Sequence, residues 1–166
     1  NGPSGWRGWY KGIDILLNAF EIVYKKSLDV KLKIVGDWEK VYIEEVLQSH
    51  LLIKERVNFI GKTQEIGKHL SESALYVHIA RGEAFGISIL EAMCAGVPAI
   101  VSEWTGAKEA VEQVNKSLIV SINPEETANK ILWYFNLSVE EKKKLSHKSR
   151  EICYQYTEER AAAEFQ

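Results

Sequence analysis

The sequence predicts an α/β fold, a Rossmann-like doubly wound parallel sheet that is covered by helices on both faces. Short apolar runs alternate with longer amphipathic segments along most of the chain, and this alternation is typical of β-α-β units with right-handed crossovers. The short runs are mainly apolar, as expected of strands that are covered on both faces. A chain of 166 residues has room for one domain with a substantial hydrophobic core.

Five segments are expected to be strands, because each is a short apolar run bounded by glycine or polar residues. They comprise residues 30–36, 57–61, 75–79, 99–102 and 118–122. Residues 1–10 are rich in glycine, tryptophan and proline and make a poor strand. The strand that should precede the first helix is therefore missing or irregular.

The remaining segments are expected to be helices, because their apolar residues recur at helical spacing. The first helix begins after Gly12, and its apolar face consists of Ile13, Leu16, Leu17, Phe20 and Val23. The next comprise residues 39–50, 64–73, 87–95, 108–113 and 123–136, and two further charged helices follow them. Gly96 and Pro98 end the helix at 87–95, as a C-terminal glycine followed by a proline does.

The composition excludes several classes of protein. The formal charge is −2, from 21 basic and 23 acidic side chains, so the chain has no overall attraction for nucleic acid or anionic membranes. No run approaches the roughly 20 apolar residues of a membrane span, and the N-terminus lacks the apolar core of a signal peptide. Cys94 and Cys153 have neither metal-ligand nor redox spacing, which favours two plain helix residues in a reduced, intracellular compartment.

One loop carries residues suited to an anionic ligand. In an open parallel sheet, ligands bind beyond the carboxyl ends of the strands, where loops meet helix N-termini. The loop at residues 82–88 lies at such an end. Gly86 lets the backbone approach a ligand closely, and the free amides of Ile87 and Ser88 would face an anion from the positive end of a helix.

Two carboxylates flank this turn. Glu83 and Glu91 have seven residues between them, with Glu91 about one turn inside the helix. Carboxylates so placed can accept hydrogen bonds from vicinal hydroxyls. A nucleoside diphosphate sugar offers such hydroxyls at both ends, with two phosphates between them. His78 lies near the end of the preceding strand, where we expect a role in the core or at its rim rather than in catalysis.

At these residues the chain becomes similar to a known family. Residues 82–100 (GEAFGISILEAMCAGVPAI) resemble the E-x7-E region of retaining GT-B glycosyltransferases of family four. Residues 11–20, 32–37, 57–61 and 106–111 resemble, in order, that family's Lys-Gly entry to its first helix, its next two strands and the segment after its fourth strand. The resemblance runs from about residue 11 to residue 156. It therefore covers nearly the whole chain.

The resemblance implies roles for the matching residues. Lys11 would pair with the donor diphosphate and stabilise the charge that builds on the leaving group, with Arg7 as its partner. Glu83 would contact hydroxyls of the donor sugar, and Glu91 would hold the ribose hydroxyls of the nucleotide. The backbone amides that would meet the sugar and the distal phosphate are those of Phe85, Gly86, Ile87 and Ser88. The base pocket would be formed by the segments that contain Gly36, Asp37, Asn58 and Phe59.

Two positions depart from the family's pattern. The family usually places four residues between its arginine and lysine, whereas three stand between Arg7 and Lys11. The family's paired glycines after the fourth strand are replaced by Thr105 and Gly106. This chain therefore departs from the family at Arg7 and at the backbone near Gly106 that would contact phosphate.

The resemblance implies a function. Residues 1–166 would be the C-terminal, nucleotide-sugar-binding domain of a hexosyltransferase that acts with retention in glycan, polysaccharide or glycolipid biosynthesis. The donor would be a UDP-, GDP- or ADP-sugar, with no metal and no further cofactor. The acceptor site would lie in an N-terminal domain of the full-length enzyme, so this chain alone is expected to bind the donor without turnover.

The expected location is cytoplasmic, with peripheral association at the inner face of the membrane through the N-terminal domain as a further option for the full-length enzyme. Two alternatives stay open at this point. The chain could belong to another GT-B enzyme such as a glycogen or starch synthase. It could also be a non-catalytic interaction domain that has kept the fold.

Overall fold

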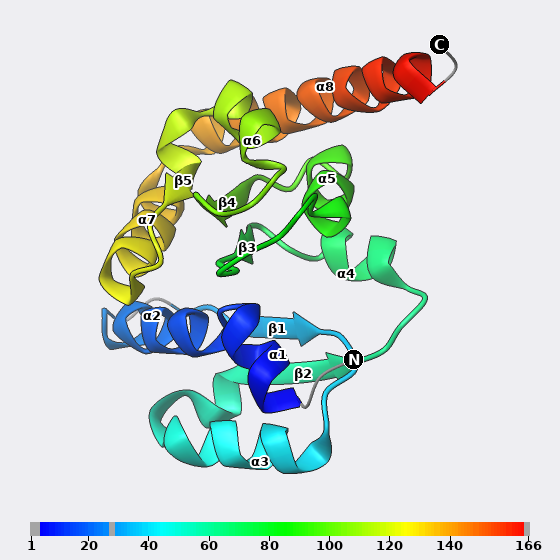
Figure 1. Cartoon of the computed structure of the whole chain (residues 1–166). Helices are drawn as coiled ribbons and strands as arrows, with labels where there is room; N and C mark the ends of the chain where they lie inside the picture. Colours follow the sequence, from blue (N-terminus) through cyan, green and yellow to red (C-terminus); the bar gives the residue numbers. More distant parts are fainter. Residues whose placement is uncertain (1–3, 27–28, 165–166) are drawn as a thin grey trace.

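Short parallel strands form two hydrogen-bonded ladders in the computed structural model, which describes residues 4–26 and 29–164. In one ladder β1 (Leu32–Val35) pairs with β2 (Val57–Gly61). In the other, β4 (Ala99–Ser102) lies between β3 (Tyr76–His78) and β5 (Ile119–Val120). Every pairing is parallel and helices alternate with the strands, which confirms the predicted α/β class (Figure 1).

The two ladders differ from the single sheet that the sequence predicts. A doubly wound sheet usually has the strand order 3-2-1-4-5-6. The ladders β2-β1 and β3-β4-β5 correspond to its strands 3-2 and 4-5-6. Among the described residues no strand occupies the position between β1 and β3, and the residues from Ser4 to Tyr10, which make a poor strand, form a helix.

The helices from α2 to α7 follow the predicted order with small differences at their ends, whereas α1 was not predicted. The helices are α1 (Ser4–Tyr10), α2 (Ile13–Lys25), α3 (Lys40–Ser49), α4 (Ile66–Ser71), α5 (Ile87–Cys94), α6 (Lys108–Val114), α7 (Pro124–Asn136) and α8 (Val139–Glu164). Two short 3-10 helices, η1 (Leu51–Arg56) and η2 (Lys116–Leu118), precede β2 and β5. The predicted strands at 30–36, 75–79 and 118–122 are each shortened, to the residues that belong to the ladders.

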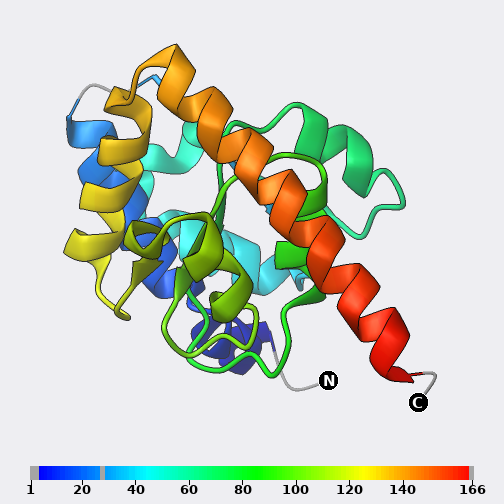
Figure 2. The same cartoon turned by 90° about the horizontal axis from the view of Figure 1, so that it is seen from above.

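The prediction of two charged helices after residue 136 is wrong. A single helix of 26 residues, α8, runs through this region. The segment has neither glycine nor proline, so nothing in it breaks the backbone pattern. Seen from above, α8 crosses the molecule and passes over α5 and α6 (Figure 2).

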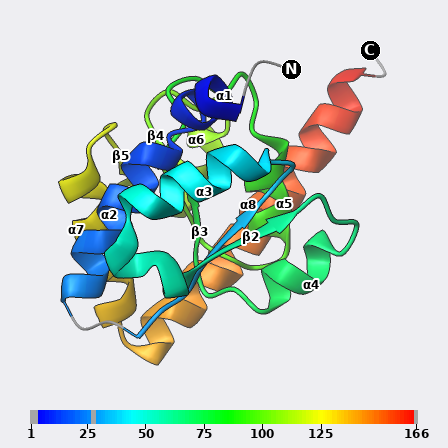
Figure 3. The same cartoon turned by 90° about the horizontal axis from the view of Figure 1, so that it is seen from below.

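Helix α2 joins the two ladders. One side of the helix, with Ala19 and Val23, packs into the core around β3, β4 and β5. Its other side, with Leu17 and Phe20, packs into a second core with β1 and β2. Seen from below, α2 lies beside α7, and α3 covers the β1–β2 side (Figure 3). Because one helix serves both cores, α2 carries more buried residues than one amphipathic face requires.

The expectation that the two cysteines are unpaired is wrong. Cys94, the last residue of α5, forms a disulfide with Cys153 of α8, and their Cα atoms are 5.3 Å apart. The pairing depends on α8 crossing α5, a packing that spacing along the chain does not reveal. Because disulfides are typical of oxidising surroundings, the cysteines do not support the expected reduced compartment. In residues 4–26 and 29–164, no helix has both the length and the apolar character that a membrane span requires.

Candidate functional site

Lys11 stands in the tight turn between α1 and α2, and this turn lies against the end of β3. The next residue, Gly12, has a φ of 69°, a left-handed conformation that glycine adopts without strain. A Cβ atom at Gly12 would clash with the carbonyl oxygen of Ile79. The glycine thus permits both the turn and the close approach that places Lys11 beside the strand end.

Glu83 is fixed by backbone contacts to the loop after β4. Its amide donates a hydrogen bond to the carbonyl of Trp104 (3.1 Å), and its own carbonyl accepts one from Gly106 (2.8 Å). The backbone also forms an isolated parallel bridge with Thr105. Glu83 therefore stands beyond the carboxyl ends of two neighbouring strands, where an open parallel sheet binds its ligands.

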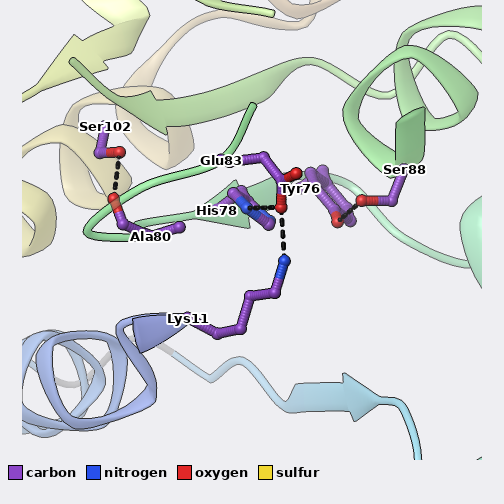
Figure 4. A network of polar contacts seen from close by, with 7 residues as sticks. All are labelled: Lys11, Tyr76, His78, Ala80, Glu83, Ser88 and Ser102. Atoms are coloured by element: carbon purple, nitrogen blue, oxygen red, sulfur yellow. Dashed lines mark hydrogen bonds and ion pairs between the residues drawn. The ribbon is translucent and has the colours of Figure 1, made fainter. Parts of the chain in front are cut away.

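The structure brings Lys11 and Glu83 into an ion pair (Figure 4). The Lys11 ammonium donates a hydrogen bond to Oε2 of Glu83, and the Glu83 side chain is 21% exposed. Burial alone would raise the pKa of Glu83. The Lys11 hydrogen bond and charge, with smaller contributions from His78 and the Phe85 amide, outweigh burial and lower it below its ordinary value. Glu83 is therefore ionised at neutral pH.

His78 belongs to the same cluster, which the sequence analysis did not anticipate. Its Nε2 lies 3.6 Å from the same Oε2 of Glu83, just beyond hydrogen-bonding distance (Figure 4). Burial and the neighbouring Lys11 charge lower the pKa of His78, although the Glu83 carboxylate acts in the opposite direction. A histidine at the carboxyl end of a strand, five residues before Glu83, was the signal available in the sequence.

The turn before α5 has the predicted form. Gly86 is buried and caps the helix with a φ of 82°, which only glycine adopts readily. The first helical hydrogen bonds run from the amides of Ile89 and Leu90 to Gly86, so the amides of Ile87 and Ser88 precede the helical ladder. Both of these residues are exposed. The positive end of α5 is therefore open to solvent.

Glu83 and Glu91 act on the same point of this site. The hydroxyl of Tyr76 donates a hydrogen bond to the Ser88 hydroxyl (2.9 Å). Burial raises the pKa of Tyr76, the Ser88 contact lowers it, and the charges of Glu91 and Glu83 both raise it. Both carboxylates are thus near enough to Tyr76, whose hydroxyl contacts the N-terminal end of α5, for their charges to act on it.

Arg7 does not join Lys11 in this cluster. Its guanidinium lies over the ring of Trp38, 4.3 Å from the ring centre, and its Nε and Nη2 atoms are buried without a hydrogen-bond partner. Trp38 directly follows Gly36 and Asp37 at the carboxyl end of β1. The structure therefore places Arg7 beside the region expected to hold the base.

The residues expected near the base are only partly brought together. Phe59 meets Trp38 edge-on, with ring centres 6.4 Å apart. Asn58 is opposite Lys33 in the β1–β2 ladder and is exposed. Because successive residues of a strand point to opposite faces, the side chain of Asn58 points away from the Phe59–Trp38 contact. Asp37 is exposed after the Gly36 turn.

Within the described ranges, three or more His, Cys, Asp or Glu side chains do not gather as the ligands of a metal ion would. The expectation that the reaction proceeds without a metal stays a prediction.

Comparison with known proteins identifies the family of the chain. The family "Glycosyl transferases group 1" matches residues 5–152. An uncharacterized glycosyltransferase from Haemophilus influenzae is 31% identical over 115 residues, which make up 69% of this chain and 33% of the relative. The chain thus spans about a third of the length of this curated relative.

Solved structures share the fold. HepE from Anabaena, in complex with UDP and glucose, has a TM-score of 0.79 and 26% identity, covering 94% of this chain and 44% of that chain. The catalytic domain of cholesterol-alpha-glucosyltransferase from Helicobacter pylori has a TM-score of 0.76 and 20% identity, covering 89% of this chain and 91% of that chain. This second likeness shows the fold alone. The chain belongs to the glycosyl transferases of group 1, and the expected Rossmann-like half of a GT-B architecture is confirmed.

Proposed function

We propose that this chain binds a nucleoside diphosphate sugar and that, together with an N-terminal acceptor-binding domain, it transfers the hexose to a hydroxyl group with retention. The observation that carries the proposal is the Lys11–Glu83 pair beside the open N-terminal end of α5. A cation, a helix end and an ionised carboxylate converge there. That combination suits a ligand with phosphates on one side and hydroxyls on the other.

Lys11 and the end of α5 would bind the diphosphate. The Lys11 side chain is 36% exposed, so its ammonium can leave Glu83 for an incoming phosphate. The amides of Ile87 and Ser88 would donate hydrogen bonds to a phosphate or to the sugar, with the positive end of the helix favouring the anion. As the bond between sugar and phosphate breaks, negative charge builds on the leaving diphosphate, and Lys11 would stabilise it.

Glu83 and Glu91 would accept hydrogen bonds from hydroxyls. Glu83, held against the loop after β4, would contact the hexose. Glu91, exposed on the first turns of α5, would hold the ribose. A ligand that carries hydroxyls at both ends and a diphosphate in the middle could use both carboxylates.

The base would lie over the aromatic residues at the carboxyl ends of β1 and β2. Trp38 and Phe59 offer apolar faces there, and Arg7 lies over Trp38 with buried donors that lack partners. A base, or the phosphate next to the ribose, could satisfy those donors. Arg7 would therefore bind the nucleotide sugar from the side of the site where Trp38 lies.

The acceptor side of the reaction needs a further domain. The chain spans about a third of its Haemophilus relative, and the Anabaena structure that holds UDP and glucose is also more than twice as extensive. An N-terminal domain would supply the acceptor site, and any peripheral contact with a membrane would be made through it. Retention at the anomeric carbon is supported by the resemblance to family four.

Calorimetric titration of the chain with UDP-, GDP- and ADP-sugars tests donor binding. We expect at least one to bind, and Glu91→Gln to weaken that binding about tenfold or more, equivalent to about 1.4 kcal/mol. Glu112→Gln, on the exposed side of α6, is the matched control and should keep the affinity. No binding by any donor, in protein shown to be folded by circular dichroism, would overturn the proposal.

Transfer itself is tested on the full-length enzyme. Proton NMR of the glycoside formed from an α-linked donor should show the coupling of an α-anomeric proton. A β-linked product would contradict retention and leave donor binding intact. If Glu91→Ala left every measurable affinity unchanged, the chain would instead be an interaction domain that has kept the fold.

A further inference from the structure

We infer that His78 is a positioning residue that replaces Lys11 as the partner of Glu83 when the donor diphosphate binds, and that it takes up a proton as it does so. The inference rests on the proposed function, because it assumes that a diphosphate draws Lys11 away. It concerns a residue outside the segments that resemble the family. It also predicts a signature, proton uptake, that donor binding by Lys11 and Glu83 alone does not require.

The geometry places two candidate partners on one oxygen atom. Oε2 of Glu83 accepts the hydrogen bond from Lys11, and Nε2 of His78 lies 3.6 Å from the same oxygen. This Nε2 is buried and has no hydrogen-bond partner. A shift of a few tenths of an ångström would bring it into hydrogen-bonding range. His78 thus already faces Oε2 of Glu83 at this longer distance, while Lys11 donates the hydrogen bond to that oxygen (Figure 4).

The imidazole is held in this position by its surroundings. His78 is the last residue of β3, and its side chain is 12% exposed. Its ring is nearly parallel to that of Tyr76, with an angle of 10° and 6.3 Å between the ring centres. The Tyr76 hydroxyl is itself bonded to Ser88 at the start of α5. A ring fixed from two elements can orient a carboxylate at little further entropic cost.

Two ionised groups face the imidazole from the neighbouring segments. Lys11 approaches from the turn between α1 and α2, and Glu83 from the loop after β3, while Tyr76 on the same strand is neutral. Burial and the Lys11 charge lower the pKa of His78, and Glu83 raises it. With Lys11 in place, the imidazole is therefore neutral at neutral pH, and Lys11 is the cation that balances Glu83.

Donor binding would change this balance. Two phosphates attract the Lys11 ammonium and would draw it away from Glu83. His78 then no longer experiences the repulsion of the Lys11 charge, and Glu83 no longer has its hydrogen-bonded partner. Both changes favour the protonated imidazole. One proton would pass from solvent to Nε2, which then donates a charge-assisted hydrogen bond to Oε2 of Glu83. Glu83 keeps a cationic partner, and its other oxygen stays available to the hydroxyls of the sugar.

Proton uptake can be measured with the intact chain and a donor. UDP-glucose is the first probe and GDP-mannose the second. The diphosphate of a nucleoside diphosphate sugar is esterified at both ends, so it does not titrate near neutral pH, unlike the terminal phosphate of UDP. Titration in buffers of different ionisation enthalpy should show uptake of up to about one proton. Affinity should rise as pH falls, by at most about tenfold per pH unit.

Variants then assign the proton to His78. His78→Asn should abolish the uptake and flatten the pH dependence of affinity, whereas His147→Asn, an exposed position on α8, should change neither. NMR titration of the His78 ring should show a higher pKa in the donor-bound chain than in the free chain. Without any donor, Lys11→Met should also raise the pKa of His78, and Lys25→Met, at the exposed end of α2, should not.

The outcomes separate this inference from the proposed function. Donor binding without proton uptake, or with equal uptake in wild type and His78→Asn, overturns the inference and leaves the proposed function in place. A His78 pKa that does not respond to Lys11→Met overturns it as well, even if His78→Asn should fail to fold. Absence of binding by every donor removes the proposed function and this inference with it.

Discussion

The guanidinium of Arg81 donates two hydrogen bonds, of 2.8 and 2.7 Å, to the carboxylate of Asp14. Arg81 also donates its backbone amide to the carbonyl of Tyr10 (2.8 Å), and its guanidinium lies over the ring of Trp9. The hydrogen bonds that Arg81 donates to Asp14 raise the pKa of Arg81 above its ordinary value. These contacts hold together the two segments that carry Lys11 and Glu83.

Breaking this pair should therefore loosen the site. Asp14 is 44% exposed, so solvent screens the pair, and a double-mutant cycle of Arg81→Gln and Asp14→Asn should give a coupling of about 1 kcal/mol in the free energy of unfolding. Urea denaturation measures it. The exposed Lys148–Glu151 pair on α8 is the matched control and should couple by less than about 0.5 kcal/mol. Equal coupling energies in the two pairs would show that the Arg81–Asp14 pair stabilises the fold no more than an exposed ion pair does.

Gly12→Ala should be strongly destabilising. The new methyl group would clash with the Ile79 carbonyl, and the backbone φ of 69° is strained for alanine. We expect a loss of about 2–4 kcal/mol in the free energy of unfolding, measured by urea denaturation. Gly67→Ala is the control, because a methyl group there meets no atom within 4 Å and the residue is helical, so that variant should be unchanged or slightly more stable. A tolerated Gly12→Ala would contradict the tight turn beside β3.

The parts of the site that the sequence predicts are those that depend on local order. The glycine turn at Gly86 and the spacing of the two carboxylates follow from the strand, loop and helix that contain them. Lys11 was found through the resemblance of residues 11–20 to the family's Lys-Gly entry to its first helix. Contacts between distant segments were not predictable in the same way. His78 was placed at the core or rim, because nothing local shows that Lys11, 67 residues earlier, turns back to it.

The same limit explains the departures in the fold. Arg7 and Trp38 meet only because α1 packs beside the end of β1. The residues of α1 were described from the sequence only as a poor strand, so this contact could not be predicted. The Cys94–Cys153 pair depends on the path of α8 across α5. Helix α2 was predicted with one apolar face, yet it packs against two cores. Predicting the second face would require knowing that a ladder of strands lies on each side of the helix.

Tyr42 should resist ionisation until strongly alkaline pH. Burial, and then the Asp14 charge, raise its pKa from 10.0 to about 12, although Arg7 acts in the opposite direction. Because the folded pKa lies above the unfolded one, the stabilising contribution of the neutral hydroxyl is complete below about pH 10 and is lost as pH rises through 12. The difference in tyrosinate absorbance between wild type and Tyr42→Phe measures this titration. A Tyr42 titration near pH 10 in the folded chain would contradict the buried position beside α1.

Reduction of the disulfide should lower stability. The bridge closes a loop with a sequence separation of 59, and a loop of this size restricts the unfolded chain by about 4 kcal/mol in the chain-entropy account. The midpoint of urea denaturation should therefore fall when a thiol reductant is added, and the double variant Cys94→Ser, Cys153→Ser should already have the lower midpoint and not respond to reductant. Alkylation of the unfolded, unreduced chain should modify neither cysteine. Modification of both would show that α5 and α8 are held only by packing, and the midpoint should then be the same with and without reductant.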